Sequence, residues 1–152
     1  MVFDYTHVHP SSKNTTVTLR YLPGHHNQVG EYCCWAYEIN IKDKGRLSVS
    51  DLEWGIHLQN HIFVADPTNV DVDQVCSPNN SIYKYERGGD DEPTVIMKKK
   101  SGDSKFNLQF VSKCDSTTNA GIVLVVKDNG KWYRVNYEGQ YGLPGPKQEK
   151  PF

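Results

Sequence analysis

Apolar and polar side chains alternate along most of the chain, in short runs separated by Gly, Pro, Asn and Asp. The clearest run, residues 32–42, puts Cys33, Trp35, Tyr37, Ile39 and Ile41 on one face. Because successive side chains of a β-strand point to opposite sides, each such run predicts a half-buried strand. Further strands are predicted at residues 15–22, 46–58, 62–65, 70–75, 81–87, 94–99, 106–110, 121–126 and 132–137.

The spacing of these runs predicts an all-β fold, a two-sheet antiparallel β-sandwich of Ig-like or jelly-roll-like type with about nine strands. We expect a single domain over residues 15–146, an N-terminal segment at 1–14 and a flexible C-terminal tail at 147–152. The chain is predicted to be extended and partly mobile from Glu138 onward. The predicted core consists of Trp35, Ile39, Ile41, Trp54, Ile56, Phe106, Leu108, Leu124 and Val126.

Two local patterns near the C-terminus predict a hairpin and a buried strand. Asp128-Asn129-Gly130 is the strongest hairpin signal in the chain, because the favoured two-residue turns need positive φ angles that Asn and Gly tolerate. Residues 121–126 are apolar at almost every position, which is typical of a central strand covered on both faces. We therefore expect a buried strand followed by a hairpin partner at 132–137.

Charge and hydropathy exclude two classes of partner. The 17 basic and 18 acidic side chains give a net charge of -1, without the basic surplus typical of nucleic-acid binding. No stretch approaches the ~20 apolar residues that span a bilayer. Asp4, His7 and His9 interrupt any early apolar core, so no secretory signal is predicted. Neither a nucleic-acid partner nor a membrane span is expected, and the sequence leaves the oligomeric state open.

The four cysteines allow two disulfides. Cys33 and Cys34 are adjacent, and a bridge between neighbours is geometrically awkward. If the chain is secreted, we expect Cys76 and Cys114 each to pair with one member of the adjacent pair. Three connectivities exist for four cysteines, and the sequence does not choose between the two that meet this condition.

A cluster of oxygen-bearing side chains lies at residues 66–73. Hard cations prefer carboxylate and carbonyl oxygens. Calcium is therefore a candidate cofactor, bound by Asp66, Asn69, Asp71 and Asp73. The segment lacks the glycine and distal glutamate of an EF-hand loop. The alternative is that Asp71 and Asp73 form the solvent face of a strand whose inner face is Val70 and Val72.

Aromatic side chains offer a candidate binding surface. Trp35 and Trp54 fall on apolar strand faces and are expected in the core. Trp132, Tyr133 and Tyr137 are the candidate ligand-binding residues, as an outward row on which sugar rings could stack, and Tyr141 is also expected to be exposed.

No local catalytic motif occurs in the chain. A nucleophile elbow, a phosphate-binding loop and a His-Glu-x-x-His motif are all missing. Paired carboxylates for glycoside hydrolysis leave no local signature, because such residues are usually distant in sequence. A hydrolase on a sandwich scaffold is thus the least favoured hypothesis, and no catalytic residue is predicted.

Two stretches carry a family resemblance. Residues 35–41 (WAYEINI), followed by Leu47-Ser48 and residues 52–58 (LEWGIHL), resemble strands of a β-sandwich domain of bacterial secreted and cell-surface proteins. Residues 121–133 and Gly145-Pro146 are similar to its closing hairpin and terminal Gly-Pro. The resemblance implies a non-enzymatic extracellular or cell-surface module, with an adhesion or structural role and a protein or glycan ligand. The alternative is a carbohydrate-binding module or lectin.

Overall fold

The computed structural model confirms the two-sheet antiparallel β-sandwich. It describes residues 8–25, 27–42, 52–58, 64–65, 70–76, 84–87, 94–98 and 104–147. These residues form eleven strands, three of them only two residues long, against about nine expected. In chain order the elements are η1 (Pro10–Asn14), β1 (Val17–Tyr21), η2 (Pro23–His25), β2 (Gln28–Val29), β3 (Tyr32–Ile41), β4 (Glu53–Leu58), α1 (Val72–Val75), β5 (Lys84–Arg87), β6 (Thr94–Lys98), β7 (Lys105–Lys113), β8 (Ser116–Thr117), β9 (Ile122–Asp128), β10 (Lys131–Arg134) and β11 (Gly145–Pro146).

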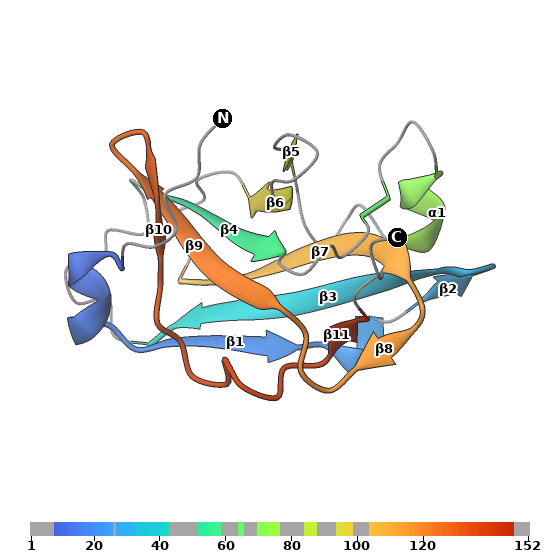
Figure 1. The fold of residues 1–152 in the computed structure, drawn as a ribbon, viewed down its shortest axis with the longest axis horizontal. Helices are drawn as coiled ribbons and strands as arrows, with labels where there is room; N and C mark the ends of the chain where they lie inside the picture. The colour runs from blue at the N-terminus through green and yellow to red at the C-terminus, as the bar shows by residue number, and fades with distance from the viewer. Residues whose placement is uncertain are drawn as a thin grey trace, which may run out of the picture.

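The first sheet, called the β3 sheet, is built around the long strand β3. Strand β7 pairs antiparallel with one edge of β3, in a register that opposes Trp35 to Phe110. The other edge is shared, because β2 pairs with the start of β3 and β1 with its end. Figure 1 shows β3 running through the length of this layer, with β1 beside it.

The second sheet, called the β9 sheet, has the order β10-β9-β4-β6-β5. The predicted hairpin is confirmed: Asp128 and Lys131 pair across a two-residue turn in which Asn129 and Gly130 have φ angles of 51° and 79°. Strand β9 lies between β10 and β4, as the apolar run at 121–126 predicts. None of the helices in the described ranges is long and apolar enough to cross a membrane.

The main core lies between the two sheets. All nine predicted core residues are buried there, with Ile39, Ile56, Leu108 and Leu124 at 0% exposure. Alternation predicts this core because each sheet presents every second side chain to the other sheet.

A second, smaller core covers the outer face of the β3 sheet. Its buried residues are Cys34, Ala65, Val72, Val75, Cys76 and Val111. Helix α1 supplies two of them, so the strand predicted at residues 70–75 is wrong. Val72 and Val75 are three residues apart and share one face of a helical turn, which buries both. In a strand this odd spacing would send them to opposite faces.

The cysteine pairing confirms the expected pattern and resolves its ambiguity. Cys33 bonds to Cys114 and Cys34 to Cys76. Adjacent residues of β3 point to opposite faces, so Cys33 joins the main core and Cys34 the second one. Each member of the adjacent pair therefore meets the cysteine on its own side of the sheet.

Both ends of the described chain are packed against the sandwich. In the predicted N-terminal segment, His9 is buried and its Nε2 lies 3.0 Å from Oδ2 of Asp128. Near the other end, Leu143, Gly145 and Pro146 are buried, and β11 pairs with β8. Backbone pairing and burial thus tie residues 138–147 to the sandwich.

Gly145 is packed so tightly that a single methyl group should disturb the fold. A Cβ at this position would lie 2.6 Å from the Cβ of Ala120 and 2.8 Å from the hydroxyl of Tyr37. That hydroxyl is held by the carbonyl of Pro144 at 2.9 Å and cannot move away freely. We expect Gly145→Ala to lower the free energy of unfolding by about 2 kcal/mol through overpacking.

Urea unfolding of Gly145→Ala beside Gly24→Ala measures this effect. No atom lies within 4 Å of a Cβ at Gly24. Its substitution should therefore change stability by less than about 0.5 kcal/mol. Equal stabilities of the two variants would show that the tail is not packed in this way.

Candidate functional site

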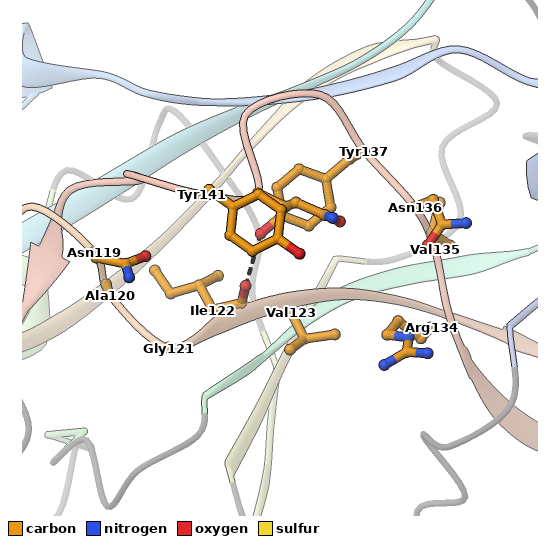
Figure 2. A pocket seen from close by; sticks show the side chains of 11 residues that line it. Asn119, Ala120, Gly121, Ile122, Val123, Arg134, Val135, Asn136, Tyr137 and Tyr141 are labelled. Atoms are coloured by element: carbon orange, nitrogen blue, oxygen red, sulfur yellow. Dashed lines mark hydrogen bonds between the residues drawn. The ribbon is translucent and has the colours of Figure 1, made fainter.

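A groove of about 470 Å³ lies where the end of the β9 sheet meets the loop that follows β10 (Figure 2). Strand β9 and the residues before it form one wall, and residues 134–141 form the other. Its described lining residues are Asn119, Ala120, Gly121, Ile122, Val123, Arg134, Val135, Asn136, Tyr137, Gln140 and Tyr141.

The loop at residues 138–143 is tied to the sandwich at three points. The Glu138 N–H donates to the carbonyl of Val17 at 2.8 Å, and the Ala120 N–H donates to the carbonyl of Leu143 at 2.8 Å. Between them, the Gly142 N–H donates to Oδ1 of Asn119 at 3.3 Å. The groove wall is thus largely formed before any ligand arrives, which reduces the entropy cost of binding.

Tyr137 forms the inner part of the groove. Its ring is 8% exposed, and its hydroxyl donates to the carbonyl of Ile122 at 2.7 Å (Figure 2). Burial raises the pKa of Tyr137 to about 12, so the hydroxyl stays protonated at neutral pH. The group is a structural anchor rather than an acid or base.

Tyr141 is the most exposed aromatic side chain among the described residues, at 84%. The turn that presents it is bounded by Gly139 and Gly142, whose φ angles of 86° and 77° favour glycine. The exposed ring supplies a flat apolar surface for a ligand.

The polar lining of the groove consists mainly of amides. Asn136 and Gln140 are exposed, and Asn119 uses its oxygen to accept from Gly142, which leaves its NH₂ group to donate. Arg134 is the one charged side chain among the described lining residues. No Asp, Glu, His, Cys or Ser occurs among them, so no general acid–base pair is assembled by these residues.

The predicted outward row of Trp132, Tyr133 and Tyr137 does not form as expected. Trp132 is only 3% exposed, and Tyr133 packs against the main core with Tyr137. Neighbouring residues of a strand point to opposite sides, so Trp132 and Tyr133 cannot share one face. Of the three, Tyr137 lines the groove. The expectation that Tyr141 is exposed is confirmed.

The groove also contains residues that the sequence did not single out. Arg134, Asn119, Asn136 and Gln140 lie on three segments, and nothing in their local sequence marks them as a set. The one available signal was that Arg134 interrupts the apolar hairpin strand. Their association depends on the path of the loop after β10.

The calcium hypothesis stays a prediction. Asp66 and Asn69 lie outside the described residues, while Asp71 and Asp73 are exposed at the start of α1 rather than on a strand. The strand interpretation of these two carboxylates is therefore wrong. Among the described residues no three His, Cys, Asp or Glu side chains are grouped in a way that could hold a metal.

A second hollow, of about 280 Å³, lies beside the Cys33–Cys114 disulfide. Tyr21, Trp35 and Pro144 line it, with Ser116, Thr117 and Thr118. The Trp35 ring is 2% exposed and offers a ligand little surface. The groove at Tyr141 is thus the better candidate for binding.

Comparisons with known proteins identify no sequence family. No protein-family model matches the chain, and no curated protein is significantly similar to it in sequence. The resemblance to a bacterial cell-surface domain therefore remains an interpretation of the strand patterns.

Several solved structures show a weak structural similarity to this chain. A GH20 exo-β-N-acetylglucosaminidase from Vibrio harveyi shares 13% identity and a TM-score of 0.41 over 89% of this chain. The chitin-binding domain of a chitinase from Pyrococcus furiosus shares 10% over 78%, with a TM-score of 0.37. The carbohydrate-binding module CBM3b of cellobiohydrolase 9A from Clostridium thermocellum shares 12% over 82%, with a TM-score of 0.36.

The covered share of these structures differs widely. The chain spans 19% of the length of the glucosaminidase, 98% of the chitin-binding domain and 99% of the CBM3b module.

Proposed function

We propose that this protein is a non-enzymatic, extracellular carbohydrate-binding module whose ligand lies in the groove beside Tyr141. The observation that carries the proposal is the combination of one exposed tyrosine ring with several amide side chains in a single groove. Sugars present apolar C–H faces and hydroxyl groups, which match a flat ring and amide donors and acceptors.

The fixed loop supports this proposal. Three hydrogen bonds hold residues 138–143, and the buried Tyr137 ring supports the groove from below. A binding site on a rigid scaffold loses little conformational entropy when a ligand arrives. An 84%-exposed ring next to several amide side chains suits a sugar better than a protein surface, so the carbohydrate-binding alternative is favoured over an adhesion role without a glycan.

The chemistry of the groove argues against hydrolysis. Glycoside hydrolysis needs two carboxyl groups that flank the scissile bond. The described lining residues include no carboxylate, and the Tyr137 hydroxyl is already used by the carbonyl of Ile122. Binding without turnover is the function that these side chains serve best.

The two disulfides support an extracellular location. Cys33–Cys114 and Cys34–Cys76 account for all four cysteines. Such bonds persist in oxidising compartments and are rare in the cytosol.

A glycan array with the Tyr141→Ala variant tests the proposal. We expect the wild type to bind a defined subset of saccharides and Tyr141→Ala to lose at least about tenfold in affinity, because truncating an exposed aromatic anchor removes a large part of the contact. The variant should fold normally, since its side chain packs against little else.

Val29→Ala is the matched control. Val29 is the other large exposed apolar side chain among the described residues, at 42%, and β2 lies at the opposite end of the molecule from β10 (Figure 1). Its removal should leave saccharide binding unchanged. The proposal fails if the wild type binds no saccharide, or if both variants bind as well as the wild type.

A further inference from the structure

The groove carries one cation and, among its described lining residues, no anion. We propose that its ligand is an acidic saccharide, a hexuronic acid whose carboxylate pairs with Arg134. This inference rests on the proposed carbohydrate-binding function and names the class of sugar that the groove selects.

The backbone of Arg134 is fixed while its side chain is free to reach a ligand. At the end of β10, Arg134 pairs with Val125 of β9, and its carbonyl accepts from the His9 N–H at 3.1 Å. The side chain is exposed, and the structure shows no ion pair or side-chain hydrogen bond between it and any described residue. The guanidinium therefore keeps all five donors available.

Three other basic side chains on the sandwich are paired with carboxylates. Arg20 lies 3.4 Å and Lys105 3.8 Å from the same carboxylate, that of Glu38. Lys113 lies 3.7 Å from Glu31. The strand register places Arg20 directly opposite Glu38, whereas Arg134 lies opposite Val125. A positive charge inside a groove, left without an internal partner, favours an anionic ligand.

The chemistry of a single arginine points to a carboxylate. The planar guanidinium matches a planar carboxylate with two parallel N–H···O bonds. One cation also balances the single negative charge of one uronic acid residue. Densely sulfated saccharides need a cluster of basic side chains, and the described lining residues contain only this one.

The lining places this contact at one end of the groove. Figure 2 shows Arg134 and Asn136 on one side, the rings of Tyr137 and Tyr141 in the middle, and Asn119 on the other side. An oligosaccharide with one ring on Tyr141 can therefore extend its carboxylate toward Arg134, while the amide of Asn136 binds a neighbouring hydroxyl.

The test compares Arg134→Gln with Lys131→Gln, which removes the same charge. Lys131 is exposed on the same strand but does not line the groove. Binding is measured by calorimetry for oligogalacturonides, neutral cello- and chito-oligosaccharides of equal length, and a heparin oligosaccharide. We expect the wild type to prefer the uronate ligands by about tenfold or more, since hydrogen bonds to charged groups are the strong ones.

Arg134→Gln should remove this preference and leave binding of neutral saccharides within about twofold, whereas Lys131→Gln should keep it. Arg134→Lys should retain part of it, because lysine keeps the charge without the planar fork. Tyr141→Ala should weaken binding of every saccharide.

Three outcomes would overturn the inference. If neutral and uronate ligands bind equally and Arg134→Gln has no effect, the groove binds carbohydrate without charge selection and the proposed function survives alone. If heparin binds best and the two glutamine variants lose equal affinity, the attraction is nonspecific. If no saccharide binds at all, the proposed function fails together with the inference.

Discussion

Removing the Cys33–Cys114 disulfide by replacing both cysteines with alanine is expected to lower the free energy of unfolding by about 4 kcal/mol in the chain-entropy model. The bond joins residues 81 positions apart in sequence. Without it, the unfolded chain gains the conformational freedom that the closed loop denies it. Because folded domains are stable by only about 5–15 kcal/mol, this change should lower the melting temperature strongly.

Loss of the Cys34–Cys76 bridge should lower the free energy of unfolding by a similar amount and also loosen one local segment. It closes a separation of 42 residues and holds α1 on the outer face of the β3 sheet. Replacing Cys34 and Cys76 with alanine should lower the free energy of unfolding by about 4 kcal/mol. In addition, amide exchange should become faster in residues 72–76, because their small core depends on this bond.

Thermal melts of both double variants, with alkylation and intact mass of the wild type, provide the measurement. The native protein should show no alkylated cysteine before reduction and four after it, since both bridges are formed. Four alkylated cysteines without reductant would mean that the native protein contains no disulfide bonds. If either variant melts at the wild-type temperature, its disulfide does not contribute to stability.

Stability should also fall as the pH drops below about 6.5, because of His57. This side chain is 1% exposed on β4, and burial lowers its pKa to about 4. In the unfolded chain His57 has a pKa near 6.5, so between pH 6.5 and 4 it binds a proton in the unfolded state but not in the folded state. The unfolded state therefore binds more protons between pH 6.5 and 4, and stability decreases as the pH falls through this window.

The expected loss from His57 is about 2 kcal/mol at pH 5 and about 3 kcal/mol at pH 4, relative to neutral pH. Carboxylates titrate in the same range, so the wild type is compared with His57→Gln by urea unfolding at pH 7, 6 and 5. The free energy of unfolding of the variant should change less with pH than that of the wild type, whatever its value at pH 7. Parallel curves for the two proteins would mean that His57 does not carry the effect.

Residues close in sequence decided much of the sandwich. The alternation in residues 32–42 depends only on the two-residue period of a strand, so it identified the inward face of β3 correctly. The Asn129-Gly130 turn depends on local φ angles, and both residues adopt the positive values that the dipeptide favours. Such local preferences act before the sheets meet, which is why they can be read without a structure.

The tertiary structure decided those features that depend on segments far apart in the chain, such as the disulfide partners and the conformation of residues 72–75. The sequence separated Cys33 and Cys34 onto opposite faces, but only the positions of α1 and of the end of β7 assigned their partners. Val70 and Val72 alternate with Asp71 and Asp73, which suggested a strand, but Val72 and Val75 are buried together in the second core on one face of a helical turn. The alternation of residues 70–73 did not reveal this burial, because it depends on Cys34, Ala65 and Val111 from distant parts of the chain.

The candidate site shows the same division. Composition alone supplied exposed aromatic side chains as candidates for sugar binding, and it identified Tyr141 correctly as exposed but Trp132 wrongly. The burial of a given ring depends on which segment lies over it, which no local pattern encodes. The groove itself arises because Asn119 and the loop after β10 are hydrogen-bonded across 23 residues. This contact and the other loop contacts are properties of the folded chain, in which Arg134 and Tyr141 line one groove.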